Sequence, residues 1–130
     1  MNDMEWMQEL TARIRALVQR GDMRQAESVA AQAMARAPHE AQPHNLMGII
    51  LESEHDHVHA MNHFRAAWAL NPAFVPARVN MERYGSFDGQ RPRPAYDEAD
   101  CAAAMAGINS GCRIEYDARG VGRMARRARG

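Results

Sequence analysis

Apolar residues near the N-terminus of the chain recur every three or four positions. They are Trp6, Leu10, Ile14, Leu17 and Val18. This spacing places them on one face of a helix that we expect from Asn2 to Arg20. Residues 21–22 interrupt the pattern. An Ala-rich stretch from Met23 to Ala37 then predicts a second helix that ends at Pro38, because proline has no amide proton and clashes with the preceding turn.

The same order of segments occurs a second time. Leu46 and Ile49 predict a helix over residues 42–54, which ends at a break at residues 55–56. The following helix is expected to run to Pro72, and its apolar residues are Met61, Phe64, Trp68 and Leu70. The pattern therefore predicts two helical hairpins in succession.

Residues 34 positions apart are often identical. Seven such pairs occur: Gln8 and Gln42, Leu17 and Leu51, Asp22 and Asp56, Ala26 and Ala60, Ala33 and Ala67, Ala35 and Ala69, and Pro38 and Pro72. They fall at helix breaks and at small residues that let two helices pack closely. We therefore expect a helical repeat region over residues 1–86, with units at 7–40 and 41–74 and a half unit at 75–84.

The second unit carries a characteristic set of residues: Met47, Gly48, Ala60, Phe64, Ala67 and Pro72. With this set the chain resembles the tetratricopeptide repeat (TPR) family, whose 34-residue unit consists of two antiparallel helices. The resemblance implies that Gly48 contacts the facing helix where Phe64 fills the core. The first unit departs from the family pattern at Ile14 and Ala30, where a small residue and an aromatic residue are usual, as terminal repeats often do.

The resemblance implies an all-α fold: antiparallel helical hairpins in a TPR-like right-handed superhelix. In this family the first helix of each unit lines a concave groove that binds a peptide. Alignment with the family gives the groove-facing candidates, which are Thr11, Arg15, Gln19, Gln42, Asn45, Ile49, Glu52, Val79 and Arg83. Arginines, amides and two apolar side chains suit a peptide with an apolar anchor and an acid. The alternative is that these residues are solvated positions on a short scaffold.

The composition of the chain limits the classes of function that we expect. Sixteen arginines balance sixteen acidic residues, and no lysine is present, so no overall field draws the chain to nucleic acid or to a membrane. No apolar run approaches the roughly 18 residues of a membrane span. No recognisable catalytic motif occurs, and Cys101 and Cys112 read as ordinary thiols. We expect a bacterial, cytoplasmic adaptor or scaffold that binds a protein or peptide, with no enzymatic activity and no cofactor.

Histidines are concentrated in one part of the chain. All six lie between residues 39 and 63, and four fall within nine residues: His55, His57, His59 and His63. His59 and His63 are one helical turn apart, a spacing that can bind zinc, nickel or copper, and Asp56 offers an oxygen. The alternative is a solvated, pH-sensitive turn, and no metal site is expected. The competing class of function is a metal-binding or enzyme-associated regulatory protein that uses this cluster.

The C-terminal part of the chain predicts a linker at 87–95 and further structure over 96–130. Asp97 is expected to cap a helix from Glu98 to Ala106. Alternating residues from Cys112 to Asp117 predict a strand, followed by a second strand from Val121. A two-stranded hairpin is marginal alone. This part is therefore expected to cap the end of the repeats or to join a second copy in a homodimer.

Four arginines lie between Arg123 and Arg129. Weak nucleic-acid binding through these arginines is a further alternative, although the segment has no aromatic residues for base stacking. A solvated terminus is the simpler interpretation.

Overall fold

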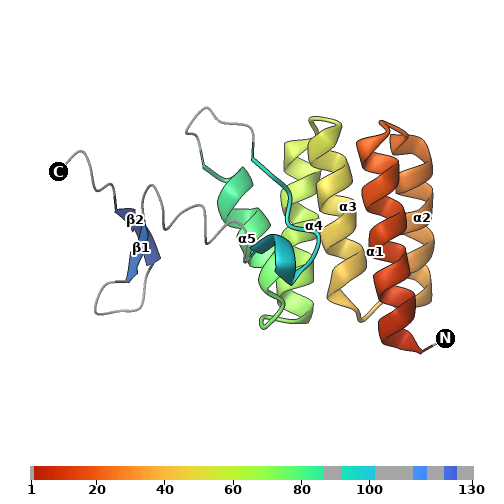
Figure 1. Cartoon of the computed structure of the whole chain (residues 1–130), viewed down its shortest axis with the longest axis horizontal. Coiled ribbons are helices and arrows are strands. Elements are labelled where there is room, and N and C mark those ends of the chain that lie inside the picture. Colours follow the sequence, from red (N-terminus) through yellow and green to blue (C-terminus); the bar gives the residue numbers. More distant parts are fainter. Residues whose placement is uncertain (1, 87–91, 102–112, 117–121, 126–130) are drawn as a thin grey trace.

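The computed structural model of the chain describes residues 2–86, 92–101, 113–116 and 122–125. These residues are mostly helical, as expected for an all-α protein (Figure 1). The five helices are α1 Asp3–Gln19, α2 Met23–Arg36, α3 Ala41–Ser53, α4 His57–Leu70 and α5 Val75–Tyr84. All five helices predicted from the hydrophobic pattern are present, with bounds close to those expected.

Helices α1, α2 and α4 begin where local side chains bond their free amides, whereas α3 and α5 have no such side-chain cap. Asn2 and Glu5 form a capping box at the start of α1, with the Glu5 N–H donating to Asn2 Oδ1 at 2.8 Å. Asp22 accepts from the N–H of Gln25 at α2, and Asp56 accepts from the N–H of His59 at α4. The two aspartates are one repeat length apart, so the 34-residue periodicity includes the helix caps.

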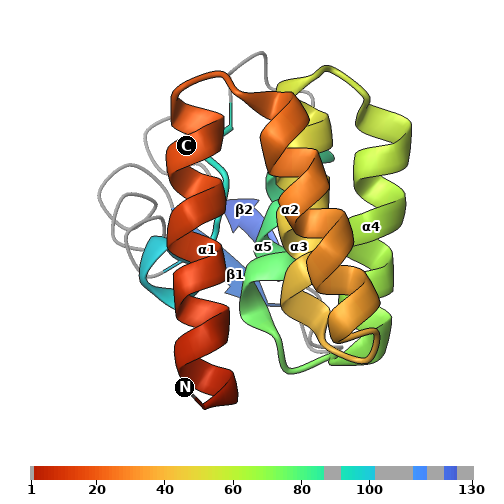
Figure 2. The ribbon, with the colours of Figure 1, turned by 90° about the vertical axis from the view of Figure 1, so that its right-hand side faces the viewer.

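The helices form two layers. Each helix packs against the next, and α1 also contacts α3, which contacts α5. Helices α1, α3 and α5 therefore lie side by side, while α2 and α4 cover their other side, and Figure 2 shows this arrangement along the row of helices. The described helices include none that is long and apolar enough to cross a membrane.

Helices α3 and α4 approach each other closely at Gly48 in α3. A Cβ atom on Gly48 would lie 2.4 Å from Phe64 Cε1 in α4, so only glycine permits this approach. The expected contact between Gly48 and Phe64 is therefore present. The equivalent positions in the first unit are Ile14 and Ala30, and both are fully buried. The large residue has moved from the second helix of the unit to the first, which explains how the first unit fills its core without an aromatic side chain.

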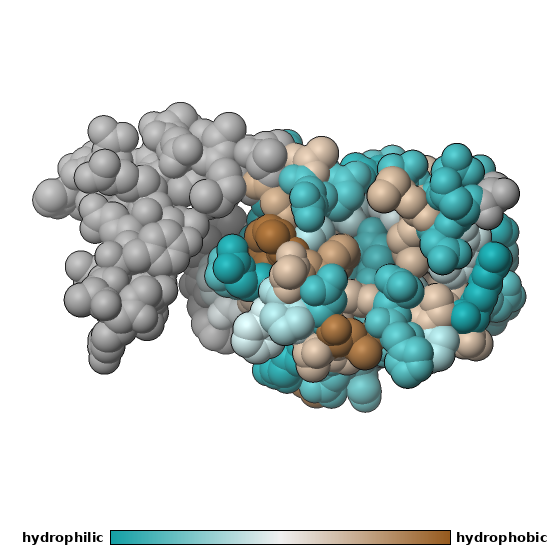
Figure 3. Space-filling view, turned by 90° about the horizontal axis from the view of Figure 1, so that it is seen from below, coloured by the Kyte–Doolittle hydropathy of each residue, from teal (hydrophilic) through white to brown (hydrophobic). Residues whose placement is uncertain are grey.

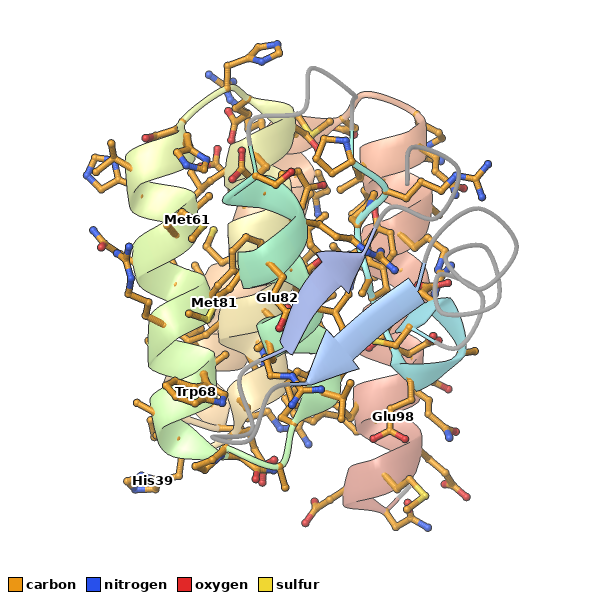
Figure 4. The ribbon with its side chains drawn as sticks, turned by 90° about the vertical axis from the view of Figure 1, so that its left-hand side faces the viewer. His39, Met61, Trp68, Met81, Glu82 and Glu98 are labelled. Atoms are coloured by element: carbon orange, nitrogen blue, oxygen red, sulfur yellow. The ribbon has the colours of Figure 1, made fainter. Side chains whose placement is uncertain are left out.

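In the described residues α5 forms no hairpin with a later helix of the kind that α3 forms with α4. Met61 and Trp68 on α4 and Met81 on α5 lie at this end of the row (Figure 4). Trp68 is 44% exposed, and the two methionines are half-buried. On the side seen in Figure 3, apolar residues form separate small patches among polar ones.

The two predicted strands correspond to β1 Arg113–Tyr116 and β2 Gly122–Ala125, which pair antiparallel with Ile114 opposite Met124. They contact each other and none of α1–α5. The expectation that the C-terminal part caps the repeats stays a prediction. Cys112 and the arginines beyond residue 125 lie outside the described residues.

The turns within the two hairpins are equivalent but carry different residues. Gly21 has φ +80° and His55, 34 positions later, has φ +66°. Glycine adopts this left-handed conformation freely, whereas for a residue with a Cβ the conformation costs roughly 1–2 kcal/mol of free energy. An added Cβ at Gly21 would have no atom within 4 Å, so the cost there comes from the backbone alone.

We expect His55→Gly to raise the free energy of unfolding by about 1 kcal/mol and Gly21→Ala to lower it by about the same amount. Urea unfolding followed by circular dichroism measures both changes. His39→Gly is the control, because His39 is also exposed but has a negative φ. A His55→Gly variant less stable than the wild type would contradict the conformational explanation.

Candidate functional site

Residues 92–101 lie across the layer formed by α1, α3 and α5 (Figure 1). Residues 92–96 have no regular secondary structure, and a helix begins at Glu98. The Asp100 N–H donates to Asp97 Oδ1 at 3.1 Å, so the predicted cap at Asp97 is confirmed. Ala102 to Ala106 of the predicted helix lie outside the described residues. We call residues 92–101 the bound segment.

The bound segment is not the linker that was predicted at 87–95. Ala95 is fully buried and Tyr96 is 5% exposed. Its prolines and charged residues resemble those of a solvated connection. Burial depends on partners 15 to 85 positions away along the chain, which composition does not reveal.

Two asparagines bond both main-chain groups of Ala95. Asn80 in α5 accepts from the Ala95 N–H at 2.8 Å and donates to the Ala95 carbonyl at 2.9 Å. Asn45 in α3 donates to the same carbonyl at 3.1 Å and accepts from Asn80 Nδ2 at 2.8 Å. Both asparagines are fully buried. The two side-chain amides thus bond the N–H and the carbonyl of Ala95 much as a neighbouring strand would.

The amide network continues to α1. Gln42 Nε2 donates to the Tyr96 carbonyl at 2.7 Å and to Thr11 Oγ1 at 2.8 Å. Gln42 Oε1 accepts from Asn45 Nδ2 at 3.2 Å, and Thr11 donates to the carbonyl of Met7. Every buried side-chain polar atom in the described residues has a partner. Three helices therefore converge on two consecutive residues of the bound segment.

Arg15 supplies the ionic part of the contact. Its Nη2 lies 3.2 Å from Asp97 Oδ2 and 3.2 Å from Asp100 Oδ2. Its guanidinium also stacks over the Tyr96 ring, 4.6 Å from the centroid. Burial raises the pKa of Tyr96 to about 12, with Arg15 opposing this and Asp100 adding to it. The phenol therefore stays neutral at physiological pH.

Arg83 holds the two ends of the bound segment from α5. It donates to the carbonyl of Arg93 and, at 3.3 Å, to the carbonyl of Asp100. Hollows remain on both sides of the segment. One is bordered by Met7, Phe74 and other residues of α1 and α5, and the other lies beside Tyr84 and Tyr96.

The predicted groove residues divide into three groups. Arg15, Gln42, Asn45 and Arg83 bond the bound segment directly, and Thr11 supports Gln42. Gln19 and Glu52 border the hollow beside Tyr96, where Glu52 also pairs with His57. Ile49 is fully buried and belongs to the same apolar cluster as Tyr96 of the bound segment.

Sequence reasoning selected Val79 and missed Asn80. The 34-residue alignment places Val79 opposite Asn45, but Val79 is only partly buried and its neighbour bonds Ala95. One feature of the sequence does point to Asn80. It is a polar residue 34 positions after Leu46, which is a core residue of the second unit. A buried amide at a core position requires a hydrogen-bonding partner.

No family model, curated protein or solved structure matches this chain. The resemblance to TPR proteins therefore rests on the repeat and on the residues that carry it.

The histidines do not converge on one point. His57 pairs with Glu52 at 2.7 Å, His59 pairs with Asp56 at 2.9 Å, and His55 is exposed in its turn. His63 faces His44 in α3, with 3.2 Å between the two Nδ1 atoms. The described residues contain no group of three potential metal ligands close enough to hold an ion. His59 and His63, whose spacing could bind a metal, thus belong to two separate pairs.

Cys101 is buried, and its Sγ lies 3.5 Å from the Asp97 carbonyl. Burial raises the pKa of its thiol, which Arg83 opposes. A buried thiol with a raised pKa is a poor nucleophile at neutral pH, so its role at this site is packing.

The His44 and His63 pair gives a pH prediction. Burial lowers the pKa of both side chains, and for His63 the neighbouring histidines add to this effect. A lowered pKa means that the folded state binds protons less tightly than the unfolded state. The stabilising contribution of the neutral pair is therefore present above the unfolded pKa of about 6.5 and is lost as the pH falls through the lowered folded values.

We expect the urea midpoint of the wild type to fall as the pH is lowered from 7.5 to 5, and to fall less in His63→Asn. His39→Asn, at an exposed histidine, is the control and should follow the wild type. Equal pH dependence of His63→Asn and the wild type would exclude this pair as the cause.

Proposed function

We propose that this chain is a protein-binding adaptor whose concave face, formed by α1, α3 and α5 of a TPR-like superhelix, holds an extended peptide of a partner protein. The observation that supports this proposal most is the amide network on the bound segment. Asn45, Asn80 and Gln42 bond main-chain groups of two consecutive residues, Ala95 and Tyr96. Peptide recognition through main-chain groups is a general way to hold an extended chain.

The chemistry of this face suits binding better than catalysis. Its charged groups are already paired, Arg15 with two carboxylates, and its buried polar groups bond one another or the peptide backbone. Main-chain bonds supply affinity for any extended segment, while the side-chain contacts of Arg15 distinguish among sequences. The face is short, so we expect dissociation constants in the micromolar range, about −8 kcal/mol.

Selection from a phage-displayed random peptide library tests this proposal. The full chain and its Tyr96→Ala variant serve as targets, so that peptides can be recovered whether or not the bound segment holds tightly. We expect recovered peptides to lose about tenfold or more in affinity on Arg15→Ala, because removing a charged partner from a part-buried site costs 1.4 kcal/mol or more.

Arg13→Ala is the matched control. Arg13 lies two positions away on α1, is exposed, and borders a different hollow near Trp6 and Arg36. Recovery of no peptide from either target, or of peptides that bind Arg15→Ala as well as Arg13→Ala, would refute the proposal.

A further inference from the structure

We infer that the bound segment is an internal copy of the motif that the partner carries, and that the partner's peptide binds by displacing it. The motif is a small residue, then an aromatic residue, then acids one and four positions after the aromatic, as in Ala95, Tyr96, Asp97 and Asp100. This inference rests on the proposed function and adds the chemical class of the partner and its competitor.

The small and aromatic positions follow from burial. Ala95 has no exposed surface and its peptide groups lie against Asn45 and Asn80, which leaves little room for a larger side chain. Tyr96 belongs to the same buried cluster as Ile14 and Ile49, and its ring lies under the guanidinium of Arg15. An aromatic ring satisfies both the apolar cluster and the cation.

The acidic positions follow from the local helix. Asp97 and Asp100 are three residues apart at the start of a helical turn, so their carboxylates lie on one side of it. Both pair with the same Arg15 nitrogen at 3.2 Å. The Asp100 carboxylate also accepts from the Tyr96 N–H at 2.9 Å, which fixes the turn relative to the aromatic ring. A peptide without these acids would leave Arg15 part-buried without its counter-charges.

The contacts of the bound segment are typical of a ligand that can dissociate. The bonds that hold residues 93–96 to the helices come from side chains of α3 and α5, whereas α1–α5 make their own backbone hydrogen bonds. The side chains of the ion pairs keep part of their exposure, 32% for Arg15, 27% for Asp100 and 48% for Asp97. Water therefore already reaches the pairs, which lowers the cost of separating them.

Attachment to the same chain gives the bound segment an advantage over a free peptide. A tethered ligand acts at an effective concentration of about millimolar when its tether is short. A competing peptide binds only the molecules in which the face is open, so its apparent affinity is its intrinsic affinity multiplied by the fraction of such molecules. Weakening the bound segment should therefore strengthen binding of the same sequence supplied from outside.

Fluorescence anisotropy with a labelled synthetic peptide of residues 92–100 tests this directly on the full chain. The key variant is Asp97→Asn combined with Asp100→Asn, because asparagine keeps the cap and the Tyr96 bond but removes the charges facing Arg15. We expect this double variant and Tyr96→Ala to bind the peptide about tenfold tighter than the wild type. In the double-variant background, Arg15→Ala should abolish the gain and Arg13→Ala should keep it.

Two altered peptides complete the experiment. Peptides with the tyrosine replaced by alanine, or with both motif aspartates replaced by asparagine, should bind the double variant at least about tenfold more weakly than the parent peptide. A double variant that keeps its helical circular dichroism but binds the parent peptide no tighter than the wild type would overturn the inference. Equal binding of the parent and altered peptides would do the same.

The outcomes also separate the inference from the proposed function. Library peptides that depend on Arg15 but lack the aromatic and acidic pattern, and do not compete with the labelled peptide, would leave the function standing and reject the motif. A wild-type dimer by light scattering that dissociates in Tyr96→Ala would assign the face to a second copy of the chain, and would reject a separate partner.

Discussion

Asn45 and Asn80 lie fully buried where α3 meets α5, and their amides require hydrogen-bonding partners that the helices alone do not provide. A buried amide without a partner costs about 1–3 kcal/mol. The two asparagines bond each other, and Asn45 also donates to Gln42, but each amide donates to the carbonyl of Ala95 and the Asn80 oxygen accepts from its N–H. The face formed by α1, α3 and α5 therefore carries a strong preference for being occupied by an extended peptide.

This requirement connects the fold to the proposed function. The 34-residue repeat sets α1, α3 and α5 side by side, and the Gly48 contact with Phe64 holds α3 close to α4. The first helices of the units then present Gln42, Asn45 and Asn80 along one line. Arg15 adds a charge at the edge of that line, where Tyr96 and two carboxylates meet it. A scaffold fixed by packing thus displays polar groups at the spacing of a peptide backbone.

Much of this arrangement could be predicted from the sequence. Hydrophobic periodicity and helix-breaking residues located all five helices, and the resemblance to TPR proteins selected Arg15, Gln42, Asn45 and Arg83. The preference for an apolar anchor and an acid agrees with Tyr96, Asp97 and Asp100 on the bound segment. The helices could be located because local spacing determines which side chains share a helix face.

Other features depend on contacts that spacing does not contain. Two examples are the role of Asn80 rather than Val79 and the pairing of His63 with His44. Both arise from how one helix meets another. Residues 92–95 of the bound segment are part of the predicted linker, because prolines and charges are typical of solvated connections. Its place is determined by side chains far away in sequence, and only the assembled helices bring them together.

Amide hydrogen exchange at Ala95, followed by NMR on the full chain, measures the central contact most directly. Asn80→Ala removes both Asn80 bonds to Ala95, and Asn62→Ala on the exposed face of α4 is the control. We expect the Ala95 amide to be protected in the wild type and in Asn62→Ala, and to lose at least about tenfold of its protection in Asn80→Ala while the α3 amides stay protected. Exchange of the wild-type Ala95 amide at the rate of an unstructured peptide would contradict an occupied concave face.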